Sequence, residues 1–233
     1  MTIAKHMQNI EKNLVLIHQQ IEQAAIDHNR CANDIVMLAV SKKKPAEDIR
    51  MAYKIGQKDF GENYLQEAQS KMPELAGLDI VWHFIGPVQS NKTRALASSF
   101  HWVHCVDRLK IAQRLNHHRS RSMPPLNICI QVNADLEPSK SGVAPSEIIP
   151  LAEAIVDLPY LRLRGLMTIP AQRSDFESQR KPFRLLALAL ANLRTRGFDC
   201  DTLSMGMSHD MQAAIAEGST LVRIGTAIFG ERL

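Results

Sequence analysis

The sequence lacks the features that mark secreted, membrane-spanning and disulfide-stabilised proteins. It has only four cysteines, far apart and without a C-x-x-C pair, which predicts buried thiols in a reducing compartment and no disulfides. These cysteines are Cys31, Cys105, Cys129 and Cys200. The N-terminus has no apolar stretch before a small-residue cleavage site, and the longest nearly apolar run, residues 185–193, is too short to span a bilayer. We therefore expect a cytoplasmic protein with no membrane partner.

Charge of one sign is not concentrated anywhere along the chain. The 28 basic and 24 acidic residues are scattered, and the net charge of +4 lacks the clustering of a nucleic-acid-binding surface. Several histidines lack the partner ligands of a metal site, so we expect structural roles for them. These histidines are His101, His104, His117 and His118. We expect no nucleic-acid partner and no metal.

The chain does have the length and the patterning of a single α/β domain. Its 233 residues, 45% of them hydrophobic, suffice for one core. No repeat or linker divides them, so we expect one domain over residues 1–233. Ile10, Leu14, Ile17 and Ile21 recur at helical spacing and predict an extra N-terminal amphipathic helix of about seven turns.

Beyond this helix, β-rich runs alternate with helical patterns through to the C-terminus. The eight predicted strands are residues 35–41, 59–63, 80–86, 101–107, 126–133, 161–169, 202–207 and 221–229. The helical stretches between them are residues 46–55, 64–71, 91–98, 109–118, 145–157, 176–195 and 211–216. Repeated βα units of this kind predict an α/β fold, a (β/α)8 TIM barrel, although an open doubly wound sheet has the same alternation. The pattern alone leaves both architectures open.

In either architecture the functional side chains lie where strands end and loops begin. At the end of the first predicted strand, alternation puts Lys42 on the inward side with Val40 and Leu38, and Lys43 on the other side. A lysine in a partly desolvated mouth beside other cations has its charged form disfavoured. Its neutral amine can then attack an aldehyde to form a Schiff base. The alternative is a run of solvated lysines before a helix.

Other predicted strand ends offer further polar groups. Asn63 places an amide at the mouth, unless it caps the following helix, and His83 is either a site residue or a hydrogen-bonded core group. Ser208 offers a hydroxyl after the seventh strand, where a helix begins. After the eighth strand, Gly225 permits close backbone approach and Thr226 adds a second hydroxyl. Barrels frequently bind phosphate between these last two loops, so the pattern indicates a phosphate site.

Five segments together carry a family resemblance. In chain order they are Ala39-Val40-Ser41-Lys42, Phe60-Gly61-Glu62-Asn63-Tyr64, Trp82-His83-Phe84-Ile85-Gly86, Ser204-Met205-Gly206-Met207-Ser208 and Arg223-Ile224-Gly225-Thr226. With these segments the chain resembles the pyridoxal 5'-phosphate (PLP) homeostasis protein family, also called YggS-like or proline synthase co-transcribed proteins. The segments are spread in order over residues 35–230. The resemblance implies a barrel like the N-terminal domain of bacterial alanine racemase.

The resemblance also implies a cofactor, PLP, and the residues that bind it. The positions that match the family's cofactor contacts are Lys42, Asn63, Ser208, Arg223, Gly225 and Thr226. Lys42 would carry PLP in imine linkage, Arg223 would face the pyridine nitrogen, and Asn63 would lie near the ring. The other three residues would hold the phosphate, and His83 is a weaker candidate.

The family is associated with intracellular PLP balance and has no established catalytic turnover, so we expect a cofactor carrier without catalytic residues rather than an enzyme. An arginine at the pyridine nitrogen would keep that nitrogen unprotonated and weaken the ring as an electron sink. The alternative is a low-activity amino-acid racemase. Alanine racemases take a second base, a tyrosine, from an additional domain, whereas this chain stops at Leu233 and has only Tyr64 near a strand end. A Schiff-base aldolase that uses Lys42 without PLP is a third reading.

The expected partners are PLP and the PLP-requiring apoenzymes that would receive it. Lys140, in the loop after the fifth strand, lies at the mouth face and could take PLP from Lys42 by transimination. The alternative is a solvated loop lysine. Because the racemases' second domain is missing, we expect a monomer.

Overall fold

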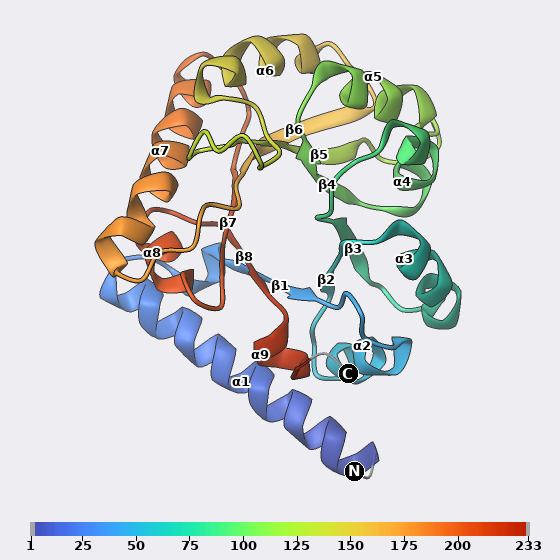
Figure 1. The fold of residues 1–233 in the computed structure, drawn as a ribbon. Coiled ribbons are helices and arrows are strands. Elements are labelled where there is room, and N and C mark those ends of the chain that lie inside the picture. The colour runs from blue at the N-terminus through green and yellow to red at the C-terminus, as the bar shows by residue number, and fades with distance from the viewer. Residues whose placement is uncertain (1–2, 232–233) are drawn as a thin grey trace.

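Eight parallel strands form a closed barrel, in which each strand pairs with the next and β8 returns to β1. The computed structural model describes residues 3–231, and Figure 1 shows the strands as a ring with helices around it. The strands are β1 (Val36–Val40), β2 (Asp59–Glu62), β3 (Val81–Phe84), β4 (Trp102–Val106), β5 (Leu126–Gln131), β6 (Leu161–Met167), β7 (Thr202–Met207) and β8 (Leu221–Ile224). The pairing of β1 with both β2 and β8 confirms the predicted TIM barrel and excludes the open sheet.

Helices lie outside the strands and cover the barrel (Figure 1). The α-helices are α1 (Ile3–Asp27), α2 (Ala46–Lys54), α3 (Leu65–Lys71), α4 (Thr93–Ser99), α5 (Leu109–His118), α6 (Ile148–Val156), α7 (Phe176–Thr195), α8 (Met211–Ala216) and α9 (Thr226–Phe229). Short 3-10 turns precede or follow some of them: η1 (Ala32–Asp34), η2 (Met72–Leu75), η3 (Ser90–Lys92) and η4 (Pro145–Glu147).

The strands have apolar residues on both faces because most of their length is buried on both sides. Along β1, Ala39 belongs to the large apolar cluster that the strands share with the helices. Leu38 and Val40 belong to a separate buried cluster with Ile85 and Leu221. Since successive strand residues point to opposite faces, this second cluster lies inside the barrel. Side chains therefore fill the interior of the barrel at the level of β1.

The N-terminal helix α1 is a structural part of the barrel wall. It packs against α2, α8 and α9 and runs along one side of the ring, as Figure 1 shows. Ile10, Leu14, Ile17 and Ile21 are all buried, which confirms the helix predicted from their spacing.

The C-terminal end of the barrel differs from its prediction. The eighth strand was predicted to continue to residue 229, but β8 ends at Ile224 and the next residues form the helical turn α9. The N–H groups of Ile228 and Phe229 both donate to the Gly225 carbonyl, which winds the chain into this turn. Asn13 Nδ2 donates to the Ile228 carbonyl at 2.9 Å. The β-branched residues of this segment favour a strand, and the tertiary contact with α1 overrides that preference.

The expectation of four buried thiols was wrong for one of them. Cys105, Cys129 and Cys200 are buried, but Cys31 is exposed at the turn between α1 and β1. Burial raises the pKa of the Cys105 thiol to about 12 and that of Cys200 to about 11. Within residues 3–231, no helix combines the length and apolar character needed to cross a membrane.

Truncation of Leu14 tests whether α1 is part of the folded core. Leu14 is 3% exposed, so Leu14→Ala should lower the free energy of unfolding by roughly 2–5 kcal/mol, because it removes buried apolar atoms and leaves a cavity. Leu16→Ala is the matched control on the same helix, since Leu16 is 52% exposed and should change stability little. Denaturant unfolding of both variants measures the difference. Equal losses would mean that α1 is not packed as described.

Candidate functional site

Strand register brings Lys42 and Asn63 to the same level at the carboxyl end of the barrel. Val40 of β1 is paired with Gly61 of β2, and each candidate lies two residues beyond its member of this pair. The Ser41 N–H donates to the Gly61 carbonyl at 3.0 Å, so the two chains stay together past the end of β1. Lys42 is half-buried in the turn that follows.

Register also brings the residues of β7 and β8 to this rim. Met207 is paired with Arg223, and Ile224 with Ala39 of β1. Ser208 therefore lies one residue beyond β7 and Gly225 one residue beyond β8, at the same end of neighbouring strands. All the candidate cofactor contacts lie at or just beyond the carboxyl ends of β1, β2, β7 and β8, the face on which TIM barrels carry their sites.

Gly225 allows the turn after β8 to approach the end of β1. A Cβ atom at this position would lie 3.2 Å from the Val40 carbonyl oxygen and 3.4 Å from the Val40 Cβ. The next residue, Thr226, is exposed and begins α9. First-turn N–H groups have no acceptor within their own helix, so the backbone here has donors available for an anion.

The sequence predicts that Ser208 lies where a helix begins, but the structure does not place it there. It is exposed in a three-residue turn, and Asp210 occupies the position before α8. The Asp210 carboxylate accepts a hydrogen bond from the Met207 N–H at 2.6 Å, which holds this turn.

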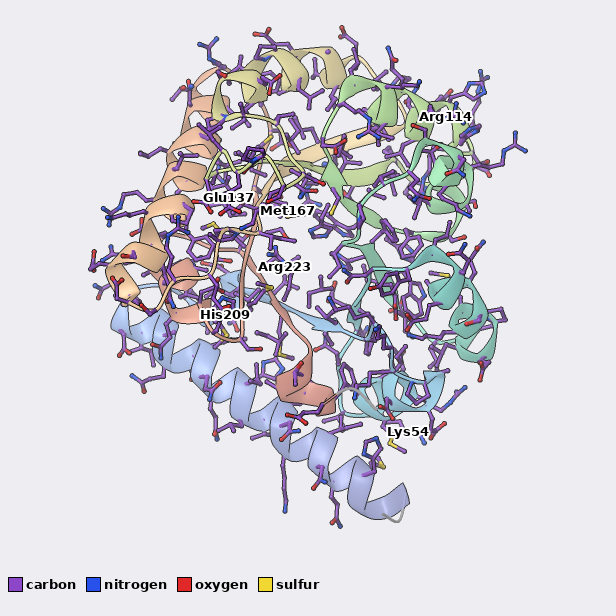
Figure 2. The ribbon with its side chains drawn as sticks, in the orientation of Figure 1. Lys54, Arg114, Glu137, Met167, His209 and Arg223 are labelled. Carbon is purple, nitrogen blue, oxygen red and sulfur yellow. The ribbon has the colours of Figure 1, made fainter. Side chains whose placement is uncertain are left out.

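Arg223 lies inside the ring of strands, where Figure 2 labels it. Its side chain is buried, and Nη1 donates to the Ser204 carbonyl at 2.6 Å and to Ser204 Oγ at 3.0 Å. Nη2 donates to the Thr168 carbonyl at 2.8 Å. Burial lowers the pKa of the guanidinium. Two hydrogen bonds to Ser204 of β7 and one to Thr168, just beyond β6, hold this cation in one orientation.

A cavity of about 240 Å³ opens between the strand ends beside Asn63. Its lining includes Ile85, Gln131 and Lys140, so the loop after β5 reaches the site. Asn63 Oδ1 is buried and, among the described residues, has no hydrogen-bond partner. The backbone of Gly86 lies directly against that of Asn63, since a Cβ atom at position 86 would lie 2.1 Å from the Asn63 carbonyl oxygen. An acceptor held beside a cavity without a donor is suited to a ligand that brings one.

A buried ion-pair network beneath the Lys42 turn escaped sequence analysis. Lys71 Nζ donates to Glu62 Oε1 at 2.9 Å, to Glu67 Oε1 at 2.5 Å and to the Ser41 carbonyl at 2.9 Å. Ser41 Oγ donates to the same Glu62 oxygen at 2.7 Å. Burial raises the pKa of Glu62, while Lys71 and Ser41 act in the opposite direction. The only signal in the sequence was the helical i,i+4 spacing of Glu67 and Lys71, which does not reveal the contact with β1.

His83 is a core residue and does not line the cavity beside Asn63. Its ring is 1% exposed, with Nε2 3.0 Å from Asp59 Oδ1 and Nδ1 3.0 Å from His104 Nε2. Burial lowers the pKa of His83 and lowers that of His104 further. His101 Nδ1 accepts the Trp82 N–H at 3.0 Å. The structure therefore agrees with the hydrogen-bonded core alternative for His83 and with structural roles for His101 and His104.

Replacement of Lys71 tests the importance of the network under the Lys42 turn. Lys71→Met should lower the free energy of unfolding by about 3–5 kcal/mol, since Glu62 would be left as a buried carboxylate without its cation. Lys58→Met is the control, because Lys58 and Asp79 form an exposed ion pair that should matter little. Thermal and denaturant unfolding compare the two variants. A Lys71→Met protein as stable as Lys58→Met would contradict the role given to this network.

Comparison with known proteins places the chain in a family. The family model described as alanine racemase, N-terminal domain, matches residues 8–233. The pyridoxal phosphate homeostasis protein of Pseudomonas aeruginosa is 53% identical over 226 residues, which cover 97% of each chain. PipY of Synechococcus elongatus PCC7942, solved with PLP bound, is 34% identical, with a TM-score of 0.84 over 95% of this chain and 100% of PipY.

Alanine racemase itself is a more distant relative. The Corynebacterium glutamicum enzyme is 18% identical, and the match covers 95% of this chain and 60% of the racemase with a TM-score of 0.69. At that identity the likeness shows the fold alone. The strand order, the family model and the 53% identical relative agree. The chain belongs to the alanine racemase N-terminal domain family and, within it, to the pyridoxal phosphate homeostasis proteins.

Proposed function

We propose that this protein binds PLP and serves intracellular PLP homeostasis, holding the cofactor as a Schiff base on Lys42. The observation that carries the proposal is the meeting of two strand ends. The turn at Gly225 and Thr226 follows β8 directly beside the end of β1, where Ile224 pairs with Ala39, and Lys42 lies two residues beyond β1. A phosphate held at that turn would bring the aldehyde of PLP to the lysine. PipY, with the same fold, was solved with PLP bound.

The residues present suit this cofactor group by group. Ser208, Gly225 and Thr226 offer two hydroxyls and backbone N–H groups to the phosphate. The orphaned Asn63 Oδ1 lies beside a cavity at the same rim and would accept a hydrogen bond from the cofactor. The buried guanidinium of Arg223 would face the pyridine nitrogen. Residues 1–233 would act as one cofactor-binding domain.

A carrier agrees better with these residues than an amino-acid racemase. PLP supplies an aldehyde for amines and a ring that withdraws electrons, and a positive guanidinium beside the ring nitrogen weakens the second property by keeping that nitrogen unprotonated. A racemase needs a proton carrier on each side of the substrate. Tyr64 is half-exposed beside Asn63, and the hydroxyl of Tyr53 already accepts the Asp79 N–H. Curated relatives such as the Pseudomonas aeruginosa protein are named for homeostasis.

We further propose that the protein acts as a cytoplasmic monomer and passes PLP to apoenzymes that require it. As an imine, the reactive aldehyde would be protected from other cellular amines. Delivery would then need an amine that replaces Lys42 on the cofactor.

Borohydride reduction followed by peptide mass spectrometry tests the binding of PLP by Lys42. Protein supplied with PLP should show a visible or near-ultraviolet imine band that disappears on reduction, and the pyridoxyl adduct should lie on the Lys42 peptide. Lys43→Ala is the matched control, because Lys43 is the next residue in the same turn and its side chain is exposed. It should retain the band, and Lys42→Ala should lose it. A Lys42→Ala protein that keeps the band and the same adduct map would refute the assignment.

Lys140 is proposed as a relay for PLP leaving Lys42. It lines the cavity beside Asn63, and its ammonium lies 3.5 Å from Glu137 Oε2. Lys140→Ala should slow transfer of PLP to an acceptor apoenzyme while Lys42 still binds the cofactor. Lys110→Ala, an exposed lysine on α5, is the control and should transfer at the wild-type rate. An unaltered transfer rate in Lys140→Ala would remove the relay.

A further inference from the structure

A chain of four hydrogen bonds, buried except at its Asp59 end, runs through the barrel and ends at Arg223. From its far end, Asp59 Oδ1 lies 3.0 Å from His83 Nε2, and His83 Nδ1 lies 3.0 Å from His104 Nε2. His104 Nδ1 lies 2.8 Å from Ser204 Oγ, which accepts a hydrogen bond from Arg223 Nη1 at 3.0 Å. The members come from five strands, β2, β3, β4, β7 and β8.

The two ends of the chain fix the direction in which its hydrogens point. A guanidinium only donates and a carboxylate only accepts, so Arg223 is the donor at one end and Asp59 the acceptor at the other. With both histidines neutral, each remaining atom then has one role. Ser204 O–H donates to His104 Nδ1, His104 Nε2–H donates to His83 Nδ1, and His83 Nε2–H donates to Asp59. Every bond is satisfied only when both rings carry hydrogen on Nε2.

Burial and aromatic packing keep the chain in place. His104 and Ser204 are fully buried, and the lowered pKa values of both histidines keep their rings neutral. The His83 ring stacks on Trp102 with ring centres 5.4 Å apart and planes 10° apart. The guanidinium of Arg164 covers the Trp102 ring at 4.7 Å. The imidazoles therefore cannot rotate freely to other partners.

The far end of the chain meets a second opening of the barrel. A cavity of about 320 Å³ at the amino ends of the strands is lined by Asp59, His83, Trp102 and Arg164, among others. Asp59 is the first residue of β2 and is 31% exposed, whereas Arg223 is buried deeper along β8. The chain thus connects solvent at the amino face of the barrel with the group proposed to contact the cofactor at the carboxyl face.

We propose that Asp59, His83, His104 and Ser204 act as positioning residues, a one-directional hydrogen-bond relay that orients the Arg223 guanidinium toward the pyridine nitrogen. The relay's effect on the cofactor rests on the proposed function. Loss of the acceptor at Asp59 removes the reason for His83 to keep its hydrogen on Nε2. If the hydrogen moves to Nδ1, His104 must accept it on Nε2 and carry its own on Nδ1. Ser204 Oγ then accepts from both His104 and Arg223, and its own O–H loses His104 as acceptor and must rotate away, which changes the guanidinium's surroundings.

Nitrogen NMR of the histidine rings, recorded without cofactor, tests the relay itself. The wild-type protein should show His83 and His104 as neutral rings with hydrogen on Nε2. In Asp59→Leu, the hydrogen of His104 should move to Nδ1, although Asp59 does not touch His104. Asp59→Asn should resemble the wild type, because the amide oxygen still accepts from His83. Asp79→Ala removes an exposed carboxylate from the same face and should leave both rings unchanged.

Each other outcome of this measurement contradicts the proposal. Hydrogen on Nδ1 of either wild-type ring would rule out the stated direction, whether or not the variants fold. A His104 signal that does not move in Asp59→Leu would show that the relay does not transmit. If Asp59→Asn behaves as Asp59→Leu, the effect comes from the charge of Asp59 and not from its acceptor.

The same variants with ¹⁵N-labelled PLP test the effect on the cofactor. The pyridine nitrogen signal should shift in Asp59→Leu and stay at the wild-type position in Asp59→Asn and Asp79→Ala. If the His104 hydrogen moves and the pyridine signal does not, the relay ends at Ser204 and does not position Arg223 for the cofactor. Failure of the wild-type protein to bind PLP contradicts the proposed function instead, and the cofactor-free spectra still decide whether the relay exists.

Discussion

Closure of the barrel between β8 and β1 is the constraint on which the site depends. Lys42 is the forty-second residue and Thr226 is close to the C-terminus, yet parallel pairing of Ala39 with Ile224 places them at the same rim. Glycine at position 225 relieves the contact between the two strand ends, since a Cβ atom there would lie 3.2 Å from the Val40 carbonyl oxygen. In an open sheet, the first and last strands would lie at different places, and Lys42 would not share a rim with the turn proposed to hold the phosphate. The fold therefore assembles the site by register rather than by local sequence.

Much of the fold could be predicted because the local pattern and the final packing agree. The helical spacing of Ile10 to Ile21 predicted α1, and doubly apolar strands such as β1 predicted a sheet covered on both faces. Disagreement arose where a tertiary contact overrides the local preference. The segment after Gly225 has β-branched residues, but its contacts with α1 make it helical. Cys31 lies in a turn beside a long helix, and its exposure depends on how that helix packs, which the spacing of cysteines does not reveal.

The candidate site was predictable only in part. Lys42, Asn63 and the Gly225–Thr226 turn stand out because they follow apolar strands, and a polar group at a strand end is visible in the sequence. Lys71 and His104 do not stand out. Lys71 lies at the end of a helix and His104 inside a strand, and each acquires its role through contacts with other elements, such as Lys71 with Ser41 and His104 with Ser204. Sequence patterns describe which face a residue occupies but not what it meets across the barrel.

Two separate sets of buried contacts support the proposed cofactor site. The network of Lys71, Glu62 and Glu67 holds the Lys42 turn. The buried hydrogen bonds of Arg223 hold its guanidinium inside the barrel. One set keeps the amine in position and the other keeps a positive charge inside the ring of strands.

A crystal structure of the protein with PLP would show directly which side chains hold the cofactor. We expect continuous electron density from Lys42 Nζ to the cofactor, with the phosphate against Gly225 and Thr226 and the pyridine nitrogen facing Arg223. Density for PLP joined to another lysine, or for a phosphate bound away from the turn after β8, would contradict it.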